Sequence, residues 1–385
     1  MNRIHRAVLV PVIVAALAAL ALPAGAQVKV GVTLSTTGPA VSLGIPEKNT
    51  IALLPKTVAG QSIEYIVLDD ASDSSAAVVN TRKLIAENKV DVIIGSTTTP
   101  NTLAMIDVVA ESQTPVISLA SSARIIEPMS AKKAWMFKTP QTDTMMVLAI
   151  LEHAAKRGMK TMGYIGFNDA LGEAFYAEFE KFAEARHIHI VASERFAPRD
   201  TSVTGQVIKL VSANPDMIVI GASGTPAVLP AKALAERGYK GTIYFNHGVA
   251  NNDFLRVGGK DIEGAYVPTS PVVVAASLPA DNAAKTAALD YKKRYESVYG
   301  EGSVSAFGSY TWDAWLELNQ AIPIALKKAK PGTREFREAL RDALEGIRDL
   351  HVSNGVVSMS KNDHLGLDQR ARVVVKVVDN KWKLD

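Results

Sequence analysis

The chain has 385 residues, with 42 lysines and arginines against 39 aspartates and glutamates, and it has no cysteine. The missing cysteine excludes thiolate metal sites, catalytic thiols and disulfide bonds. The balanced charge, without a basic stripe, argues against a nucleic-acid partner, and the length suits two domains rather than one.

The first 26 residues have the pattern of a secretory signal. Two arginines precede an apolar run over residues 7–22, and the small residues "AGA" follow it and end at Ala26. This order of charged, apolar and small-residue regions predicts cleavage after Ala26 and a periplasmic location. A retained membrane anchor is the alternative, and no other stretch is long and apolar enough to cross a bilayer.

From residue 28 onward, short β-rich runs alternate with longer segments of helical periodicity. In the first series, strands are predicted at residues 28–34, 63–69, 90–95 and 115–120, with helices at 74–88 and 101–112. Strands that alternate with helices imply a parallel sheet with crossover helices.

A second series of the same kind begins after residue 143. Its strands are predicted at residues 161–167, 189–196, 216–221 and 241–246, its helices at 144–158, 172–186, 203–214 and 225–238, and a further extended segment at 265–274. The sequence therefore predicts an α/β fold of two Rossmann-like lobes with parallel sheets.

Two loops at the ends of predicted strands resemble each other. "VDVIIGSTTTP" (90–100) and "PDMIVIGASGTP" (215–226) share an aspartate, an apolar strand and the same glycine-to-proline spacing. Open α/β sheets bind ligands beyond the carboxyl ends of their strands, so the two loops are expected to face each other across a cleft. The hydroxyls from Ser96 to Thr99, with the N–H groups of a following helix, suit an anion. The lack of a lysine favours a carboxylate over a phosphate, and a helix cap without a ligand is the alternative.

Motifs for catalysis are mostly absent. No GxGxxG or GxxxxGK[ST] occurs, and "GASGT" lacks the last glycine of a GxSxG nucleophile elbow. Two S-x-x-K tetrads, beginning at Ser130 and Ser358, have no companion S-D-N or K-T-G motif. An enzyme is therefore not expected.

Metal ligands can be imagined at two places. His187 and His189 would share one face of a strand, and three aspartates lie between residues 69 and 73. The aspartates fit better as a strand-end turn that caps the next helix, where carboxylates accept from free N–H groups. Neither a metal nor another cofactor is expected.

Five stretches together carry a family resemblance. They are "VKVGVTLSTTGPAVSLG", "LDDASDSSAAVVNTRKLIAENKVDVIIG", "TPVISLASS", "FNHGVAN" and "VSAFGSYTWDAWLELNQAI", in this order along the chain. They resemble the branched-chain amino acid (Leu/Ile/Val) binding proteins of ABC importers, which have the type I periplasmic binding fold, and the aromatic-acid-binding branch of that family. The resemblance implies a monomer that delivers its ligand to a membrane permease.

The resemblance also implies how the two lobes share the chain. Three crossovers would join them, near residues 139–143, 265–271 and 350–356, and the lobes would close on the ligand by hinge motion. The N-terminal lobe would then contain residues 28–140 and 270–350. The C-terminal lobe would contain residues 141–269 and 351–385.

The family pattern places ligand-binding residues on both lobes. Hydroxyls of Ser96 and Thr97, with Thr98 close by, would hold a carboxylate. The stretch around Ala120 would add a backbone carbonyl and a hydroxyl. The remaining positions that the resemblance implies are Ser121, Ser122, Leu43, Phe167, Leu171, Ser223, Gly224, His247 and Phe307.

One position departs from the amino-acid-binding members. Where they carry a glutamate for the ligand ammonium, in a stretch like "PEGVGN", this chain has "NHGVAN", which puts His247 there. Histidine cannot replace a carboxylate as an ammonium partner. The expected ligand is therefore a small carboxylate without a recognised ammonium, such as an aromatic or other organic acid. Two alternatives concern the function: an amino acid or amide ligand, and a regulatory ligand sensor of the same fold. A third concerns His247, whose ring would then be hydrogen-bonded to nearby backbone groups and not to a ligand.

Overall fold

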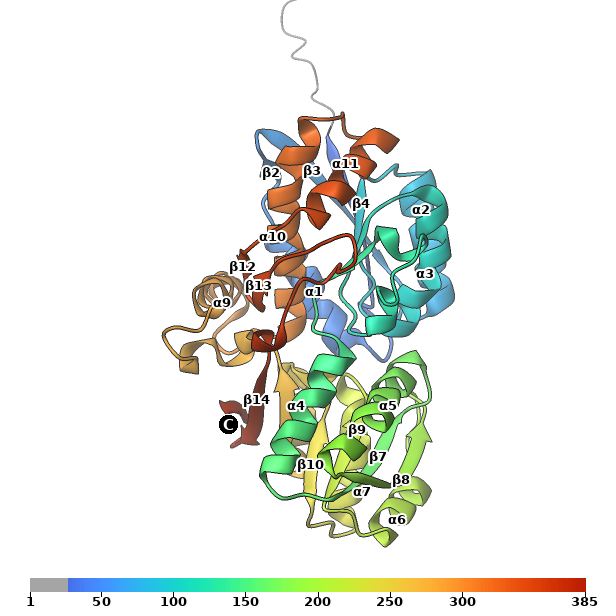
Figure 1. Cartoon of the computed structure of the whole chain (residues 1–385), viewed down its shortest axis with the longest axis vertical. Helices are drawn as coiled ribbons and strands as arrows, with labels where there is room; N and C mark the ends of the chain where they lie inside the picture. The colour runs from blue at the N-terminus through green and yellow to red at the C-terminus, as the bar shows by residue number, and fades with distance from the viewer. Residues whose placement is uncertain (1–26) are drawn as a thin grey trace, which may run out of the picture.

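The computed structural model describes residues 27–385 and shows two α/β lobes stacked along the long axis of the molecule (Figure 1). The first lobe is built on a six-stranded sheet of order β2-β3-β1-β4-β5-β6, and the second on a seven-stranded sheet of order β15-β14-β11-β10-β9-β7-β8. The predicted α/β class and two-lobe organisation are confirmed. The predicted signal and its cleavage after Ala26 lie outside the described residues.

The first sheet is parallel except at one edge. Its strands are β1 Val28–Leu34, β2 Thr57–Val58, β3 Gln61–Asp69, β4 Val92–Gly95, β5 Val116–Ser118 and β6 Met136–Lys138. Only β2 pairs antiparallel, with β3. Strand β1 lies between β3 and β4, and its apolar side chains, at alternate positions from Val28 to Leu34, are buried on one face in the first core cluster.

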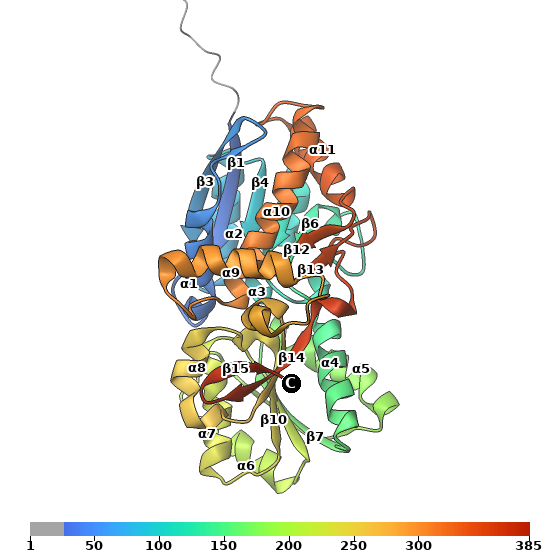
Figure 2. The same ribbon diagram turned by 90° about the vertical axis from the view of Figure 1, so that its left-hand side faces the viewer.

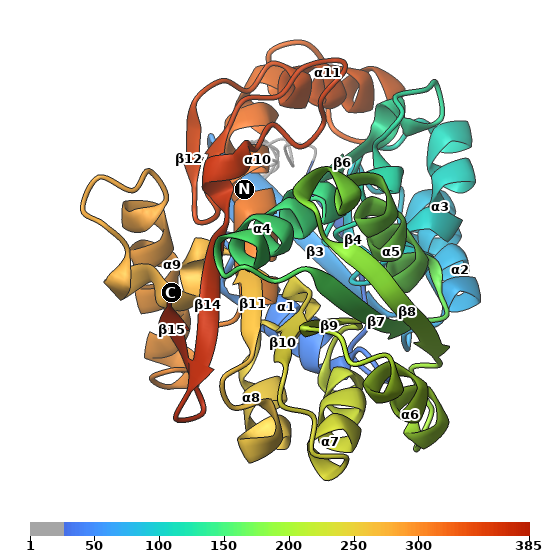
Figure 3. The same ribbon diagram turned by 60° about the horizontal axis from the view of Figure 1, so that its bottom comes forward.

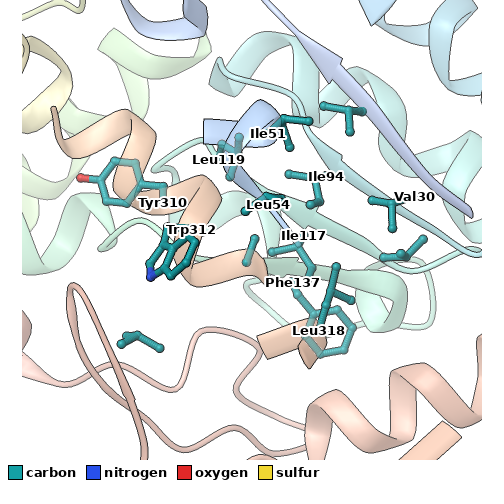
Figure 4. Packing of buried hydrophobic residues seen from close by; sticks show 14 of the residues in the cluster. Val30, Ile51, Leu54, Ile94, Ile117, Leu119, Phe137, Tyr310, Trp312 and Leu318 are labelled. Atoms are coloured by element: carbon teal, nitrogen blue, oxygen red, sulfur yellow. The ribbon is translucent and has the colours of Figure 1, made fainter. Parts of the chain in front are cut away.

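Helices cover both faces of this sheet. Those of the first lobe are α1 Val41–Leu53, α2 Ser74–Ala86, α3 Thr99–Ser112, α9 Lys285–Tyr299, α10 Ala306–Leu326 and α11 Arg334–Glu345. One core cluster joins the sheet to α1, α10 and α11, and another joins its opposite face to α2 and α3. Figure 4 shows part of the first cluster, where Leu318 of α10 lies near Phe137 of β6 and Ile117 of β5.

The second sheet has the same parallel core with two antiparallel strands added at one edge. Its strands are β7 Thr161–Phe167, β8 His189–Phe196, β9 Met217–Gly221, β10 Thr242–Phe245, β11 Tyr266–Thr269, β14 Val373–Val378 and β15 Lys381–Leu384. Its helices are α4 Asp143–Lys156, α5 Ala170–Phe182, α6 Thr204–Ser212, α7 Val228–Glu236 and α8 Asn252–Gly258. Figure 3 shows α4 and α5 on one side of this sheet and α6, α7 and α8 on the other.

The chain passes between the lobes at three places. The first passage follows β6, and the second follows β11. The third differs from the expected 350–356. Those residues form most of a hairpin, β12 Leu350–Val352 and β13 Gly355–Val357, whose Val352 and Val357 belong to the first core cluster.

The position of this hairpin has a clear cause in α10. The carboxylate of Asp313 accepts hydrogen bonds from the backbone N–H groups of Ser353 (2.8 Å) and Asn354 (3.1 Å), which form the hairpin turn. The turn is therefore held on the first lobe, and the chain returns to the second lobe only at β14 (Figure 2). Across residues 27–385, none of the helices has the length and apolar character that a membrane span requires.

Candidate functional site

The loop after β4 delivers a row of hydroxyl residues to the junction of the lobes. Gly95 has φ +121°, and a Cβ there would lie 2.1 Å from the Thr33 carbonyl oxygen, so only glycine fits. Helix α3 begins at Thr99 with Thr98 as its N-cap and proline in its first turn. The first-turn N–H groups of a helix have no intrahelical partner, so they are free to face a ligand.

The first two hydroxyls of this loop contact the protein itself. Ser96 Oγ donates to Asp70 Oδ2 at 2.6 Å, and Thr97 Oγ1 donates to Glu47 Oε2 at 2.5 Å. Thr97 Oγ1 also accepts from the backbone N–H of Ser35 at 3.0 Å. Burial raises the pKa of Glu47 well above its usual range, against the opposing effect of the Thr97 hydrogen bond. The hydroxyls of Ser96 and Thr97 are therefore used in hydrogen bonds that hold the loop in place.

Two adjoining cavities lie between the lobes. The inner one, of about 30 Å³, is bordered by both lobes. Its lining residues are Leu43, Thr97, Thr98, Thr99, Leu119, Ala120, Ser121, Pro140, Leu171, Ser223, His247, Gly248, Phe307 and Tyr310. The outer cavity, of about 300 Å³, shares Thr98, Leu171 and Ser223 with the inner one. Because Thr98 and Ser223 line both, the two similar loops face each other across this cleft, as predicted.

Most of the predicted site residues line the inner cavity. They are Leu43, Thr97, Thr98, Ala120, Ser121, Leu171, Ser223, His247 and Phe307. Phe167 lines the outer cavity instead. Ser96 is buried beneath the loop, and Ser122 is the N-cap of the short helix η1 Ala123–Ile125, where its hydroxyl accepts from Arg124 N–H at 3.3 Å.

Gly224 lies where the two lobes touch. A Cβ built on Gly224 would be 3.1 Å from Ser42 Oγ and 3.4 Å from the Pro39 carbonyl oxygen, both at the start of α1. Its φ is +65°, and its N–H donates to the Gly248 carbonyl at 2.9 Å, a bond that holds the loop within the second lobe. The second lobe therefore approaches the first closely at this point.

His247 is buried and faces the inner cavity from the short helix η5 His247–Val249. Within the described part of the chain, neither of its ring nitrogens has a hydrogen-bond partner. Burial, assisted by the charge of Lys138, lowers its pKa to about 3, so the ring is neutral at physiological pH. A neutral ring with one free donor and one free acceptor is suited to a polar group of a ligand.

The hydroxyl of Thr99 is a second unsatisfied group at this wall. Thr99 Oγ1 is buried and has no partner among the residues that the structure describes. Thr99 belongs to the hydroxyl row that was expected to suit an anion, but the ligand positions implied by the family resemblance end at Thr98. Tyr310, Pro140, Leu119 and Gly248 were also missed as lining residues. Of these, Tyr310 could have been found from the sequence, because it lies within the stretch "VSAFGSYTWDAWLELNQAI" that carries the family resemblance.

The other polar motifs have structural roles. Asp73 caps α2 by accepting from Ala76 N–H at 2.8 Å, which confirms the capping interpretation of that turn. His189 pairs with Glu184 at the exposed end of β8. Among residues 27–385, no group of three or more histidine and carboxylate side chains is arranged to hold a metal ion.

Comparisons with known proteins give one consistent answer. Residues 27–380 match the family model described as periplasmic binding protein. Leu/Ile/Val-binding protein homolog 7 of Brucella abortus is 24% identical over 318 residues, which are 78% of this chain and 77% of the relative.

Two solved structures extend the comparison. An extracellular ligand-binding receptor from Rhodopseudomonas palustris HaA2 has a TM-score of 0.91 and 42% identity, covering 94% of this chain and all of that one. A solute-binding protein of an ABC transporter from Rhodopseudomonas palustris BisB5, in complex with 3,4-dihydroxybenzoic acid, has a TM-score of 0.77 and 22% identity, covering 92% of this chain and 95% of that one. This chain therefore belongs to the periplasmic binding protein family, among the solute-binding proteins related to the Leu/Ile/Val-binding proteins.

Proposed function

We propose that this protein captures a small organic acid, aromatic acids being the preferred class, and presents it to the membrane permease of an ABC importer. The observation that carries the ligand class is the inner cavity. Among the described residues that line it, none is an aspartate or a glutamate, and the neutral His247 occupies the position expected to meet an ammonium. An α-amino acid would leave its ammonium without a charged partner there, which typically costs several kcal/mol.

The other residues of the inner cavity suit an acid with an apolar body. The first turn of α3 offers N–H groups and the Thr99 hydroxyl to a carboxylate. Leu43, Leu171 and Phe307 supply apolar contacts on the inner wall. Such a pocket is mostly apolar with a few placed polar groups. The aromatic acid held by the relative from Rhodopseudomonas palustris BisB5 is consistent with this assignment.

A branched-chain amino acid is the second candidate, because the Brucella relatives are named as Leu/Ile/Val-binding proteins. A thermal-shift screen separates the two. Its ligands are benzoate, 3,4-dihydroxybenzoate, 4-hydroxycinnamate, leucine, valine and leucinamide. At about 100 times Kd a ligand adds about 2.7 kcal/mol of stability, or roughly 5 °C in Tm. Shifts with leucine or valine, and none with the acids, would overturn the proposal in favour of an amino-acid ligand.

A further inference from the structure

Lys138, the last residue of β6, is a fully buried cation at the first passage between the lobes. Its Nζ donates to the carbonyl oxygens of Pro140 at 2.5 Å and Gln141 at 3.3 Å. Over residues 27–385, none of the ion pairs within 4.0 Å includes Lys138. Two neutral carbonyls replace only part of the hydration that this ammonium loses.

The ammonium lies directly behind the inner cavity. Pro140, which accepts its hydrogen bond, is a lining residue. On another wall, the charge of Lys138 contributes to the low pKa of His247. The Lys138 charge is therefore felt inside the cavity, although its side chain is not part of the lining.

Several acidic groups surround Lys138 without pairing with it. Asp143 at the start of α4, Glu127 after η1 and Asp363 after β13 all raise the lysine pKa, while burial outweighs them and lowers it to about 7. Asp143, whose charge has the largest effect of the three, is itself buried, and burial raises its pKa to about 6 against the opposing effects of Lys138 and the Ser122 hydroxyl. Glu178 of α5 adds to that rise. The site thus holds a cation that still lacks a close anion.

We propose that Lys138 is the specificity-determining charge of the cleft: its buried ammonium favours a ligand that brings a net negative charge into the inner cavity and disfavours zwitterions and neutral amides. A carboxylate bound in the inner cavity would supply the missing negative charge. Because little water lies between it and the Lys138 ammonium, their attraction would be weakly screened. An α-amino acid would bring an ammonium of the same sign as Lys138. This inference rests on the proposed function and names the physical basis of its ligand choice.

The test compares an acid with its amide by titration calorimetry. The probe is the tightest-binding acid of the screen, benzoate, 3,4-dihydroxybenzoate or 4-hydroxycinnamate, together with the amide of the same acid. We expect the unaltered protein to prefer the acid and Lys138→Met to lose about tenfold or more of that preference. Lys132→Met removes an exposed lysine of the same lobe and should leave the preference unchanged. A merely structural role would weaken acid and amide alike and so would overturn the proposal.

The pH dependence supplies an independent readout. Lys138 carries its charge below a pKa of about 7, so the Kd for the acid should rise as pH increases from 6 to 8, by up to about tenfold per unit above that pKa. Lys138→Arg keeps the charge and should keep the acid preference, with a flat profile between pH 7 and 8, where Asp143, whose pKa is about 6, is already ionised. A flat profile in the unaltered protein contradicts the proposal even if Lys138→Met fails to fold. If no acid binds at all, the proposed function fails; if an acid binds and Lys138→Met keeps its preference, only this inference fails.

Discussion

Four adjacent hydroxyl residues, from Ser96 to Thr99, have two different roles in the cleft. The first two are bonded to the buried carboxyl groups of Asp70 and Glu47, and they hold the loop in place. Among described residues Thr99 Oγ1 has no partner, and Thr98 caps α3 without a side-chain hydrogen bond. The hydroxyls that remain for a ligand, those of Thr98 and Thr99, are thus two residues further along the chain than the Ser96 and Thr97 that the family pattern implies.

A pair of isosteric substitutions separates these roles. Thr97→Val removes the partner of both Glu47 and the Ser35 N–H, so it should lower the free energy of unfolding by about 1 to 3 kcal/mol. Thr99→Val removes a hydroxyl with no partner in the described structure, so the ligand-free stability should be unchanged within about 0.5 kcal/mol. Acid affinity should fall about threefold to tenfold in Thr99→Val. Urea unfolding and calorimetry measure the two effects. Loss of stability without loss of affinity in Thr99→Val would contradict this assignment.

The sequence could predict the loop but not which of its hydroxyls face the cleft. Composition and spacing placed the row at the end of a strand and at the start of a helix, and both are confirmed. The deciding partners lie 26 residues away, at Asp70, and 50 residues away, at Glu47. Only the folded arrangement of β3 and α1 against β4 brings them under the loop.

His247 should make stability depend on pH. Its folded pKa of about 3 is below its ordinary value of 6.5, so the unfolded chain binds the proton first as pH falls. Stability is therefore fully present above 6.5 and is lost as pH falls toward 3, by up to about 1.4 kcal/mol per unit. His247→Gln should remove this part of the slope in urea unfolding between pH 6 and 4. Replacing the exposed His189 in the same way is the control, and equal slopes in all three proteins would refute the prediction.

At the scale of elements, helix α10 holds the first lobe together through both apolar and acidic side chains. Asp313 accepts from the backbone N–H groups of the β12–β13 turn and from the side chains of Ser353 and Asn354. One turn later, Glu317 is buried, and within the described chain neither of its carboxyl oxygens has a partner. Burial, then the nearby Asp313 charge, raises the pKa of Glu317 well above its usual range.

Glu317→Gln should therefore stabilise the protein more at high pH than at low pH. The unfolded chain releases the Glu317 proton near 4.5 while the folded chain retains it, so the unaltered protein loses stability as pH rises. The gain from the substitution should be small at pH 4.5. It should grow by up to about 1.4 kcal/mol per unit until the folded pKa is passed.

Chemical unfolding at pH 5 and pH 8 measures this difference. Glu335→Gln, in the first turn of α11 on the exposed surface, is the matched control and should show no such growth. A gain for Glu317→Gln that is equal at both pH values would mean that Glu317 is already ionised in the folded state.

Local sequence patterns predicted most helices and strands, but not to which lobe the last strands belong. The strands at 28–34, 161–167 and 189–196 have the bounds that their periodicity indicates. Residues 350–356 were expected at the return to the second lobe, yet they stay on the first. The reason is the carboxylate of Asp313, about 40 residues upstream, which fills the turn of the hairpin. No local pattern in residues 350–357 indicates that Asp313 is their partner.

At the scale of the whole molecule, the connections between the lobes are bonded to one another. Gln141, in the first passage, donates to the Ala371 carbonyl at 2.6 Å and accepts from Tyr310 OH at 3.2 Å. Thr139 Oγ1 donates to the Tyr310 carbonyl at 3.0 Å. These bonds tie the first and third passages to α10. Any rotation of the lobes must therefore be shared by the connections as a group.

The contact of Gly224 with Ser42 allows this rotation to be blocked by a disulfide. In a disulfide each Cβ lies about 3 Å from the far sulfur, and the Cβ built on Gly224 lies 3.1 Å from Ser42 Oγ. In this cysteine-free chain, Ser42→Cys combined with Gly224→Cys should therefore cross-link the lobes on oxidation. The backbone of Gly224, with φ +65° and ψ −164°, lies in a region that essentially only glycine adopts, so a cysteine there costs about 1 to 3 kcal/mol, in both redox forms alike.

Ligand exchange is the measurement for this double variant. Oxidation in the presence of a bound acid should slow its release by at least tenfold, and reduction should restore the rate. Each single cysteine variant is a control, and neither should respond to oxidation. Rapid exchange from the cross-linked protein would show that ligand can leave without separation of these two loops.

The pairing of β14 with β11 has a consequence for how the protein is made. Thr269 of β11 is opposite Val373 of β14, so the edge of the second sheet stays open until nearly the whole chain has been synthesised. Such long-range pairing forms slowly and late. A ribosome-bound chain that stops before Val373 should therefore stay sensitive to added protease, and one that continues through β15 should become resistant on release. The last residues to leave the ribosome are thus the ones that close the exposed β11 edge of the second sheet.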